Sequence, residues 1–416
     1  MPSPLARHWA LDPEVTFLNH GSYGACPIEV LAVQREWRDR LEQQPVKFMS
    51  RDLHGLLAHA RRAVAAFVGA DPDDLAFVTN ATGGVNAVLR SLEFEPGDEI
   101  LTTDHEYNAI LNVARHVAAR DRARMVVARL PFPATSPDDV VEGIIASTTD
   151  RTRLAVISHV TSPTALVFPI ARIVAELRER GIDTLVDGAH APGMVPLELE
   201  TLGAAYYSAN LHKWVCAPKG AAFLHVRRDR QAVVRPTTIS HGANAPEPRG
   251  PRFRTEFDWQ GTLDPTAWLA APKAIELVGG LVDGGWPGVM ARTRAMALDA
   301  GRAVAGALGD VGGTDPELLL PPDAMIGAMV ALPLPSDGPL GGPASTDQSS
   351  PLDADPLQTR IYDRFAIEVP IGPFPVPAVE SAEPPRRLIR VSTALYNDPS
   401  DVGRLVDALR NIAAGS

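Results

Sequence analysis

From Leu75 to Arg227 the chain repeats one pattern: a short apolar, β-branched run, then a polar or glycine-bearing turn, then a helical stretch. Several of these runs are apolar on both alternating faces, which is typical of strands buried between layers of helices in a mostly parallel sheet. The pattern predicts an α/β fold with a seven-stranded, mostly parallel sheet sandwiched by helices. The expected strands are Leu75–Thr79, Glu99–Thr102, Arg124–Ala128, Leu154–Ser158, Thr184–Val186, Ala204–Tyr207 and Ala221–Val226.

After Gly261 the pattern changes to longer helical stretches and shorter strands. A chain of 416 residues exceeds the size at which one core keeps growing, so a second domain is expected. We expect an N-terminal arm (1–30), a large domain (31–280) and a smaller α+β domain (281–416), with a mobile surface insertion rich in Pro, Gly, Ser and Asp near 335–356. The elements expected after Gly261 are helices at Trp268–Val278 and Trp286–Leu308, and strands at Ala328–Leu332, Ile367–Pro370 and Leu388–Val391.

Composition narrows the class of ligand. The net charge of -11 argues against nucleic acid as a partner, because such binding needs a basic surface, and it favours a small molecule. Cys26 and Cys216 are too few for a disulfide framework or a structural zinc site, which is typical of a reducing cytoplasm. Met1–Glu14 carries no apolar signal-peptide run, and no stretch approaches the ~20 apolar residues of a membrane span. We therefore expect a soluble cytoplasmic protein without a metal or a membrane partner.

Three groups of residues follow expected strands, where open α/β sheets bind ligands. The first, Asn80-Ala81-Thr82, opens a helix. Small residues at a helix N-terminus let backbone N–H groups approach an anion such as a phosphate, although an ordinary capped turn has the same residues. The turn matches neither the G-x-G-x-x-G nor the Walker pattern, which argues against a dinucleotide or ATP.

The second group is Asp187, at the end of an apolar strand, with His190 three residues later. A carboxylate at a strand end can pair with a protonated pyridine nitrogen and make that ring a better electron sink, and His190 could touch the same ring. The alternative is an Asp that caps the next helix.

The third group is Asn210-Leu211-His212-Lys213-Trp214, again after an apolar run. A desolvated lysine among such neighbours has a lowered pKa and can attack an aldehyde as the neutral amine. A lone lysine beside a tryptophan is more often a surface residue with a buried stem. Here the order favours chemistry, because an anion-binding turn, a strand-end acid and a lysine each follow a strand of one sheet.

In this order the motifs resemble those of the fold-type I pyridoxal 5'-phosphate (PLP) enzymes of the class V aminotransferase family, within it the isopenicillin N epimerase-like branch. The resemblance runs from about Thr16 to Leu405 and rests on several separate motifs. It implies PLP as cofactor, Lys213 as Schiff-base lysine and general base, and Asp187 as partner of the pyridine nitrogen. It places the other cofactor contacts at Asn80, Ala81 and Thr82 around the phosphate, at His190 beside the ring, and at Asn210 and His212 in the Schiff-base segment.

The resemblance also assigns residues outside these motifs. Glu106-Tyr107 is similar to the family's acid-then-ring pair, which makes Tyr107 the ring that stacks on the cofactor, with His105 as its rival. Arg390 corresponds to the clamp on the substrate α-carboxylate, a grip that suits a guanidinium, although a surface salt bridge would explain it too. The remaining assignments are Asn19, His20, Ser22 and Tyr23 on the substrate side, and Gly261 and Thr262, which in the family reach the phosphate from the second subunit of a homodimer.

The resemblance does not select one reaction, since the group includes sulfur extrusion from cysteine, C–S cleavage, epimerisation and transamination. A cysteine desulfurase needs a nucleophilic thiol ahead of the arginine, and Ile361–Arg390 contains none, which leaves only Cys26 for such a role if it folds over the site. We expect an epimerase-like enzyme acting at the α carbon of an amino acid, with a C–S lyase or an aminotransferase as alternatives. Epimerisation needs a second proton donor, for which Tyr107 and the His20–Tyr23 segment are candidates.

Three other classes are weaker. A metal-dependent hydrolase could use His159, Asp187, His190 and His212, but no H-x-x-x-H pattern supports it and Lys213 would lie beside the cation. A nicotinamide dehydrogenase lacks the glycine fingerprint. A non-catalytic PLP-binding regulator would need a DNA-binding module, for which the residues before Thr16 leave no room.

Overall fold

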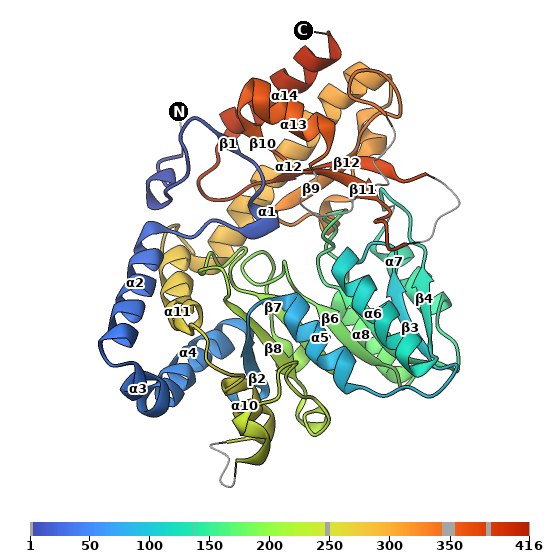
Figure 1. Ribbon diagram of the computed structural model, residues 1–416. Helices are drawn as coiled ribbons and strands as arrows, with labels where there is room; N and C mark the ends of the chain where they lie inside the picture. Colours follow the sequence, from blue (N-terminus) through green and yellow to red (C-terminus); the bar gives the residue numbers. More distant parts are fainter. Residues whose placement is uncertain (1–2, 135, 246–249, 343–353, 380–383, 416) are drawn as a thin grey trace.

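The computed structural model describes residues 3–134, 136–245, 250–342, 354–379 and 384–415 (Figure 1). Its main element is a seven-stranded sheet of order β2-β8-β7-β6-β5-β3-β4, in which β8 runs antiparallel to β2 and β7 and the other pairs are parallel. The strands are β2 (Leu75–Val78), β3 (Glu99–Thr103), β4 (Arg124–Ala128), β5 (Thr152–Ser158), β6 (Asp183–Asp187), β7 (Tyr206–Asn210) and β8 (Ala222–Val226). The predicted seven-stranded, mostly parallel sheet is confirmed.

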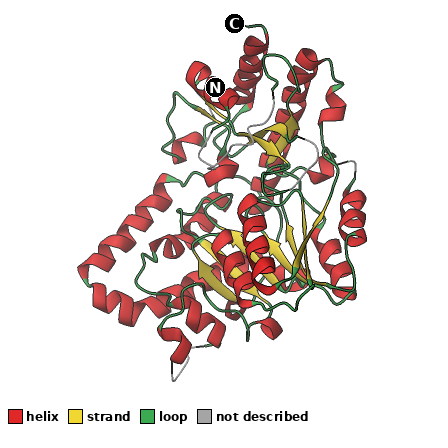
Figure 2. Ribbon diagram, turned by 45° about the vertical axis from the view of Figure 1, so that its right-hand side comes forward, coloured by secondary structure: helices red, strands yellow, loops and turns green. Residues whose placement is uncertain are grey.

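Helices cover both faces of this sheet because the side chains on both sides of each strand are apolar. In β2, Leu75 and Phe77 belong to one core, whereas Ala76 and Val78 belong to the other. The first face is covered by α4 (Leu53–Val68), α7 (Pro137–Ala146), α8 (Ile170–Glu179) and α11 (Thr266–Gly279), and the second by α5 (Ala81–Ser91), α6 (Asn108–Asp121) and α10 (Arg252–Asp258). Figure 2 shows the strands between these helical layers.

The C-terminal part has a core of its own. An antiparallel sheet of order β11-β12-β9 packs against α12 (Gly285–Gly312) and α14 (Pro399–Ala413). Its strands are β9 (Met329–Pro333), β11 (Ile371–Phe374) and β12 (Arg386–Ser392), and α13 (Pro356–Phe365) precedes β11. Strand β11 was not predicted, because its sequence Ile-Gly-Pro-Phe contains the two residues that most disfavour strands.

The strand expected at Ile367–Pro370 differs most from its prediction. Only Ile367–Glu368 (β10) is extended in a ladder, and it pairs in parallel with β1 (Thr16–Phe17) instead of joining the C-terminal sheet. Of the predicted insertion, residues 343–353 lie outside the described part of the chain. Its described ends are anchored, since Leu340 is buried and Asp355 forms a buried ion pair with Arg387.

The N-terminal segment follows β1 into α1 (His20–Tyr23), which in Figure 1 lies between the large sheet and the C-terminal elements. The elements that complete the fold are α2 (Ile28–Gln43), α3 (Pro45–Lys47), a π-helical turn at Phe48–Asp52, α9 (Leu199–Leu202), and short 3-10 turns at Ala6–His8, Pro72–Asp74, Arg228–Arg230, His241–Asn244, Pro316–Leu319 and Asp323–Met325.

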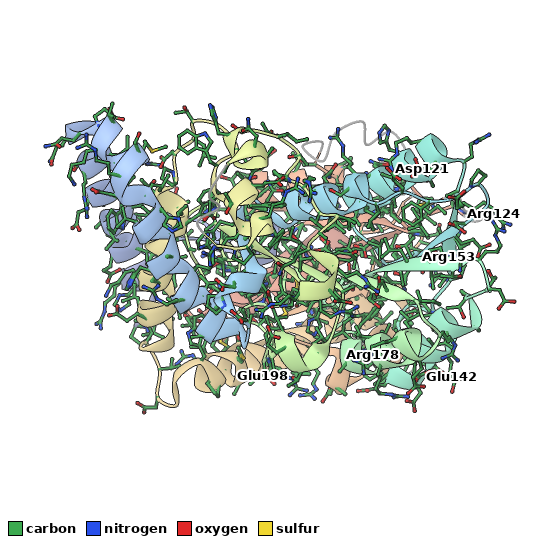
Figure 3. All side chains as sticks on the ribbon, turned by 90° about the horizontal axis from the view of Figure 1, so that it is seen from below. Asp121, Arg124, Glu142, Arg153, Arg178 and Glu198 are labelled. Carbon is green, nitrogen blue, oxygen red and sulfur yellow. The ribbon has the colours of Figure 1, made fainter. Side chains whose placement is uncertain are left out.

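The two ends of the parallel strands in the large sheet carry different kinds of residues. Figure 3 views the molecule from the edge where the parallel strands begin, and there Arg124 and Arg153 have exposed side chains that pair with Glu99 and Asp98. The carboxyl ends of the same strands point the other way, toward α1 and the C-terminal sheet, and this edge holds the residues described next.

Candidate active site

The candidate site is centred on the carboxyl ends of β5, β6 and β7. Ser158, Asp187 and Ser208 are paired across these three strands, so their backbones end side by side. Lys213 follows β7 in the same direction and is close enough to Asp187 that its positive charge opposes the rise in that carboxyl's pKa. The sheet therefore brings the predicted acid and the predicted lysine to one edge, on the same side of the fold.

Lys213 is half-buried at this edge. Its Nζ lies 2.9 Å from Nε2 of His190, the predicted neighbour of the cofactor ring. Burial and the nearby Arg390 charge together lower the pKa of Lys213 to about 7, against the opposing effect of Asp187. An amine with such a pKa is largely neutral just above pH 7, which is the form that attacks a carbonyl.

Arg390, in β12, is the second cation of the site and is half-buried, with its Nε fully enclosed. Its Nη1 donates to the carbonyl of Ser162 (2.6 Å), and its Nη2 donates to Oγ of Ser22 (3.0 Å). Its Nε has no hydrogen-bond partner among the described residues, and none of their carboxylates forms an ion pair with it. Burial lowers its pKa to about 10, so the guanidinium stays charged and lacks a counter-ion at neutral pH.

The N-terminal segment supplies four of the predicted substrate-side residues. Ser22 Oγ donates to Oδ1 of Asn19 (2.5 Å) while accepting from Arg390, and Asn19 Nδ2 donates to Glu368 (3.1 Å). The ring of Tyr23 is 61% exposed. These contacts place Asn19 and Ser22 next to the Arg390 guanidinium.

His20 lies deeper than its predicted role suggests. Its Nε2 donates to the carbonyl of Lys213 (2.9 Å), so its Nδ1 accepts from the hydroxyl of Tyr396 (2.8 Å). Both ring nitrogens are therefore used by the protein, and the buried ring holds the Lys213 segment in place. The proposed contact of His20 with substrate stays a prediction.

The predicted anion-binding turn is tied firmly to β7. Asn80 caps α5, with its Oδ1 accepting from the N–H of Gly83 (2.8 Å). The N–H of Ala81 donates to Oδ1 of Asn210 (2.8 Å), and the carbonyl of Ala81 accepts from Oγ of Ser208 (2.9 Å). Thr82 follows in the first turn of α5. The helix N-terminus thus opens at the edge of the sheet that holds Lys213.

Of the two candidate stacking rings, only Tyr107 faces the site. Burial raises the pKa of Tyr107, Tyr23 and Asp187 add to the rise, and Arg390 opposes it. The residue is 39% exposed. The rival His105 points into the core, where its ring nitrogens contact Thr164 Oγ1 (2.7 Å) and the Leu130 carbonyl (3.3 Å).

Glu106 is a site residue that the sequence analysis quoted only as part of a motif. Its Oε1 accepts from Ser158 Oγ (2.7 Å) and from the N–H of Tyr107 (2.7 Å), and its buried Oε2 has no partner in the described part of the chain. Burial, together with the nearby Asp187, raises the pKa of Glu106 to about 8. Two buried carboxylates cannot both be ionised at such close range, so Glu106 carries the proton. Its position directly after β3 was the available signal.

Ser162 and Trp214 are the other residues without a predicted role. Ser162 accepts from Arg390, and its place a few residues after β5 could have been recognised as another strand end. Trp214 contacts His190 through its indole nitrogen, a contact that the sequence gives no means to foresee. His212, which the sequence predicted as a cofactor contact, points its Nδ1 to the carbonyl of Ala221 (3.1 Å).

Gly261 and Thr262 are not packed against other residues of the described chain. A methyl group added at Gly261, where φ is +108°, would meet no described atom within 4 Å, and Thr262 is exposed. Their predicted contact comes from a second subunit, so a single chain does not test it.

The two cysteines are both buried in apolar surroundings. Burial raises the pKa of Cys26 to about 12, and it raises the pKa of Cys216 further. Neither is a ready thiolate, which argues against a persulfide-forming role.

The residues named for a metal hydrolase do not come together. In the described residues, the one group of three metal-ligating side chains with ligand atoms within 4.8 Å of one another is Asp74, Glu200 and His225, away from this site. There, Asp74 is already engaged by Arg228 and Gln231.

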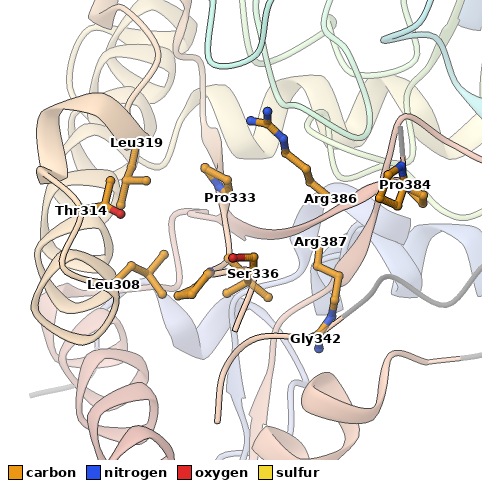
Figure 4. Close-up of a pocket in the computed structure, with 12 residues that line it drawn as sticks. Leu308, Thr314, Leu319, Pro333, Ser336, Gly342, Pro384, Arg386 and Arg387 are labelled. Atoms are coloured by element: carbon orange, nitrogen blue, oxygen red, sulfur yellow. The ribbon is translucent and has the colours of Figure 1, made fainter. Parts of the chain in front are cut away.

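Two further observations concern the surface. A cavity of about 530 Å³ lies between α12 and the C-terminal sheet, lined by Leu308, Pro333 and Arg386 among others, and contains none of the predicted site residues (Figure 4). Among the described residues, no helix is both long and apolar enough to span a bilayer.

Comparison with known proteins agrees with this geometry. A protein from Amycolatopsis lactamdurans named isopenicillin N epimerase is 37% identical, over 97% of this chain and 96% of that protein. A protein from Arabidopsis thaliana named probable L-cysteine desulfhydrase, chloroplastic, is 30% identical over 96% of this chain and 83% of its own. A solved structure of a cystine C–S lyase matches with a TM-score of 0.74 at 21% identity, covering 96% of this chain and 98% of that one.

These matches confirm the predicted fold, that of the fold-type I enzymes. The family model described as aminotransferase class-V matches residues 27–279, which includes the strand-end acid, the lysine and the anion-binding turn. The chain belongs to the class V aminotransferase family.

Proposed function

We propose that this protein is a PLP-dependent enzyme that acts at the α carbon of an amino acid or a compound derived from one. The observation that carries the proposal is that the desolvated amine of Lys213 and the buried strand-end acid Asp187 lie close enough to shift each other's pKa, near a guanidinium that has no carboxylate partner among the described residues. Lys213 would supply the covalent attachment, and Asp187 would interact with the ring nitrogen.

The residues present fit the cofactor. The capped N-terminus of α5 offers backbone N–H groups to a phosphate, and the flat, half-exposed ring of Tyr107 offers a stacking face. Bound PLP supplies an electron sink for the pair released when a bond to the α carbon breaks. Asp187 would keep the ring nitrogen protonated. Asp187 can stay ionised in this role because its neighbour Glu106 is protonated and adds no second negative charge.

The substrate carboxylate fits the Arg390 guanidinium, whose buried Nε has no partner in the described part of the chain, while Ser22 and Ser162 hold its other nitrogens. Binding there would place the α carbon between Lys213 and Tyr107. Lys213, with its pKa of about 7, accepts a proton from the α carbon near neutral pH.

Within this class we propose an isopenicillin N epimerase-like activity, in which Lys213 moves the proton on one side and Tyr107 stands on the other. The 37% identity to a protein named isopenicillin N epimerase supports it. A β-eliminating C–S lyase is the second candidate, which the relative named probable L-cysteine desulfhydrase favours, and that reaction needs Lys213 alone as base. We further propose a cytoplasmic homodimer, with Gly261 and Thr262 completing the partner's phosphate site.

The first test is spectroscopic. Protein purified with PLP should be yellow, its absorbance band should be bleached by borohydride, and Lys213→Ala should abolish the bleachable band. As a matched control, Lys219→Ala, at a lysine whose Nζ donates to the Gly24 carbonyl, should keep it. A colourless wild-type protein after reconstitution with PLP would overturn the proposal.

The second test separates the two reactions. A panel of L-amino acids is incubated in deuterated water, and exchange at the α carbon, chirality and products are followed. Exchange with inversion supports the epimerase, whereas keto acid plus thiol supports the lyase. Absence of exchange and of any product across the panel would contradict both.

A further inference from the structure

Three side chains form a continuous hydrogen-bonded row beside the site. The indole Nε1 of buried Trp214 lies 3.4 Å from Nδ1 of His190, and Nε2 of the same imidazole lies 2.9 Å from Nζ of Lys213. The row therefore runs from Trp214 through His190 to Lys213.

The chemistry of the three groups fixes the protons in this row. An indole nitrogen can only donate, so Nδ1 of His190 must accept and carries no proton. A neutral imidazole then has its proton on Nε2, which donates toward Lys213. A nitrogen that receives this proton must offer a lone pair, and an ammonium has none. The contact at 2.9 Å is therefore satisfied only by a neutral amine.

We propose that Trp214 is a positioning residue that fixes His190 as the Nε2–H tautomer and thereby keeps the free amine of Lys213 unprotonated. The proposal rests on the proposed function only for the use made of that amine. It assigns Trp214 a part in preparing the lysine, beyond packing next to it.

The surroundings keep the row in place. The Trp214 ring lies 4.9 Å from the ring of His20, which is itself fixed by the Lys213 carbonyl and the Tyr396 hydroxyl, so the indole has little freedom to turn. Burial holds the pKa of His190 well below its ordinary value, and the charge of Arg390 acts in the same direction, which excludes the imidazolium at neutral pH.

Taken together, burial and the charged groups around Lys213 also favour its neutral amine. Asp187 on β6 favours the ammonium, while Arg390 on β12 and burial itself disfavour it. His20 on α1 and His212 in the lysine's own loop are the other titratable groups nearby, and burial lowers the pKa of each to about 4, so they stay neutral.

The test compares Trp214→Phe, which removes the indole N–H but keeps an aromatic ring, with the control Trp286→Phe. Trp286 also donates through Nε1, to the Ile275 carbonyl (3.0 Å), away from the lysine. Two readouts are used: the imidazole tautomer, from ¹⁵N NMR of histidine-labelled protein with His190 assigned through His190→Gln, and the pH dependence of Lys213 acetylation by acetic anhydride, followed by mass spectrometry.

In the wild type and in Trp286→Phe, His190 should show the Nε2–H tautomer. In Trp214→Phe the Nδ1–H tautomer should appear, and the midpoint for Lys213 labelling should rise by about one pH unit, from about 7 to about 8, which makes the reaction about fivefold slower at pH 7. A wild-type His190 with its proton on Nδ1 overturns the inference even if Trp214→Phe fails to fold. An unchanged tautomer and midpoint in a folded Trp214→Phe also overturns it. Neither readout requires PLP, so failure of the proposed function would appear separately, as loss of PLP binding by a wild type with the expected tautomer.

Discussion

Arg390 is the residue whose surroundings say most about the substrate. Burying a guanidinium without an anion costs free energy, and the described carboxylates offer it none. A carboxylate brought by the substrate would offset that cost, and hydrogen bonds to a charged group contribute about 1.5–3 kcal/mol each.

We therefore expect Arg390→Ala to raise KM for an amino-acid substrate about 10- to 100-fold, since each 1.4 kcal/mol is a factor of ten. The absorbance of bound PLP should change little. Arg390→Lys, which keeps the charge but loses the fork-shaped donors, should fall in between. Steady-state kinetics measures both, and an unaltered KM in Arg390→Ala would place the carboxylate elsewhere.

Glu106 makes the site sensitive to pH in the opposite sense from an ordinary acid. Its pKa rises from 4.5 to about 8 on folding, so between these values the folded protein holds a proton that the unfolded chain has released. Rising pH therefore favours unfolding. This contribution to stability is complete below about pH 4.5 and is lost as the pH rises through about 8.

Glu106→Gln keeps both acceptor contacts of the side chain but cannot titrate. The urea midpoint of the variant, relative to wild type, should increase as the pH is raised from about 5 to 8. Asp98→Asn is a suitable comparison, because Asp98 is also buried but lies at the opposite edge of the sheet, paired with Arg153. A constant difference between wild type and Glu106→Gln across this range would mean that Glu106 is ionised in the folded state.

At the scale of elements, the N-terminal segment closes over the lysine loop at Gly24. Its φ is +69°, and a methyl group built there would lie 2.1 Å from the carbonyl oxygen of His212 and 3.0 Å from Cα of Lys213. Only a residue without a side chain allows the two segments to approach so closely.

Gly24→Ala should therefore lower the free energy of unfolding by about 1–3 kcal/mol and weaken retention of PLP, because the added methyl displaces the lysine loop. Gly55→Ala, in α4, adds a methyl that meets no described atom within 4 Å, and it should be neutral or stabilise the protein by up to about 1 kcal/mol. Urea unfolding and dialysis against PLP-free buffer measure the two effects. Equal behaviour of the two variants would show that the segments can separate freely.

The strands also show how much of the fold could be predicted from the sequence alone. The βα strands were placed correctly because their apolar runs are buried on both faces, although the strand before Lys213 extends to Asn210, three residues beyond Tyr207. The pairing of β10 with β1 could not be predicted from the sequence. Two-residue strands show no periodicity, and no local sequence pattern links residues so far apart in the chain.

For the site, strand-end position and motif order were enough to bring Asp187 and Lys213 together as candidates, and the family resemblance added Arg390. They were not enough to reveal the proton on Glu106 or the contact of Trp214 with His190. Both depend on side-chain packing between separate elements, which has no local signature in the sequence.

At the scale of the whole molecule, the proposed homodimer would place Gly261 and Thr262 of one subunit in the phosphate site of the other. If each site combines Lys213 of one subunit with Thr262 of the other, defects in the two residues can complement each other. A mixed dimer of Lys213→Ala and Thr262→Trp chains would then have one site with both defects and one with none.

Either variant alone should be inactive, and co-expression in equal amounts should restore about a quarter of wild-type activity, since half of the dimers are mixed and each has one intact site of two. Sedimentation analysis should give a dimer for every sample. Activity no greater than the sum of the single variants would contradict a shared site.

The pairing of β1 with β10 and of His20 with Tyr396 has a consequence for biosynthesis. The ribosome delivers Thr16–Phe17 first, yet these residues must wait for Ile367–Glu368 before they gain a neighbouring strand. A chain that ends before Ile367 therefore contains Lys213 but lacks both of these anchors of the N-terminal segment. We expect that segment to be fully anchored over the Lys213 loop only when translation is nearly complete.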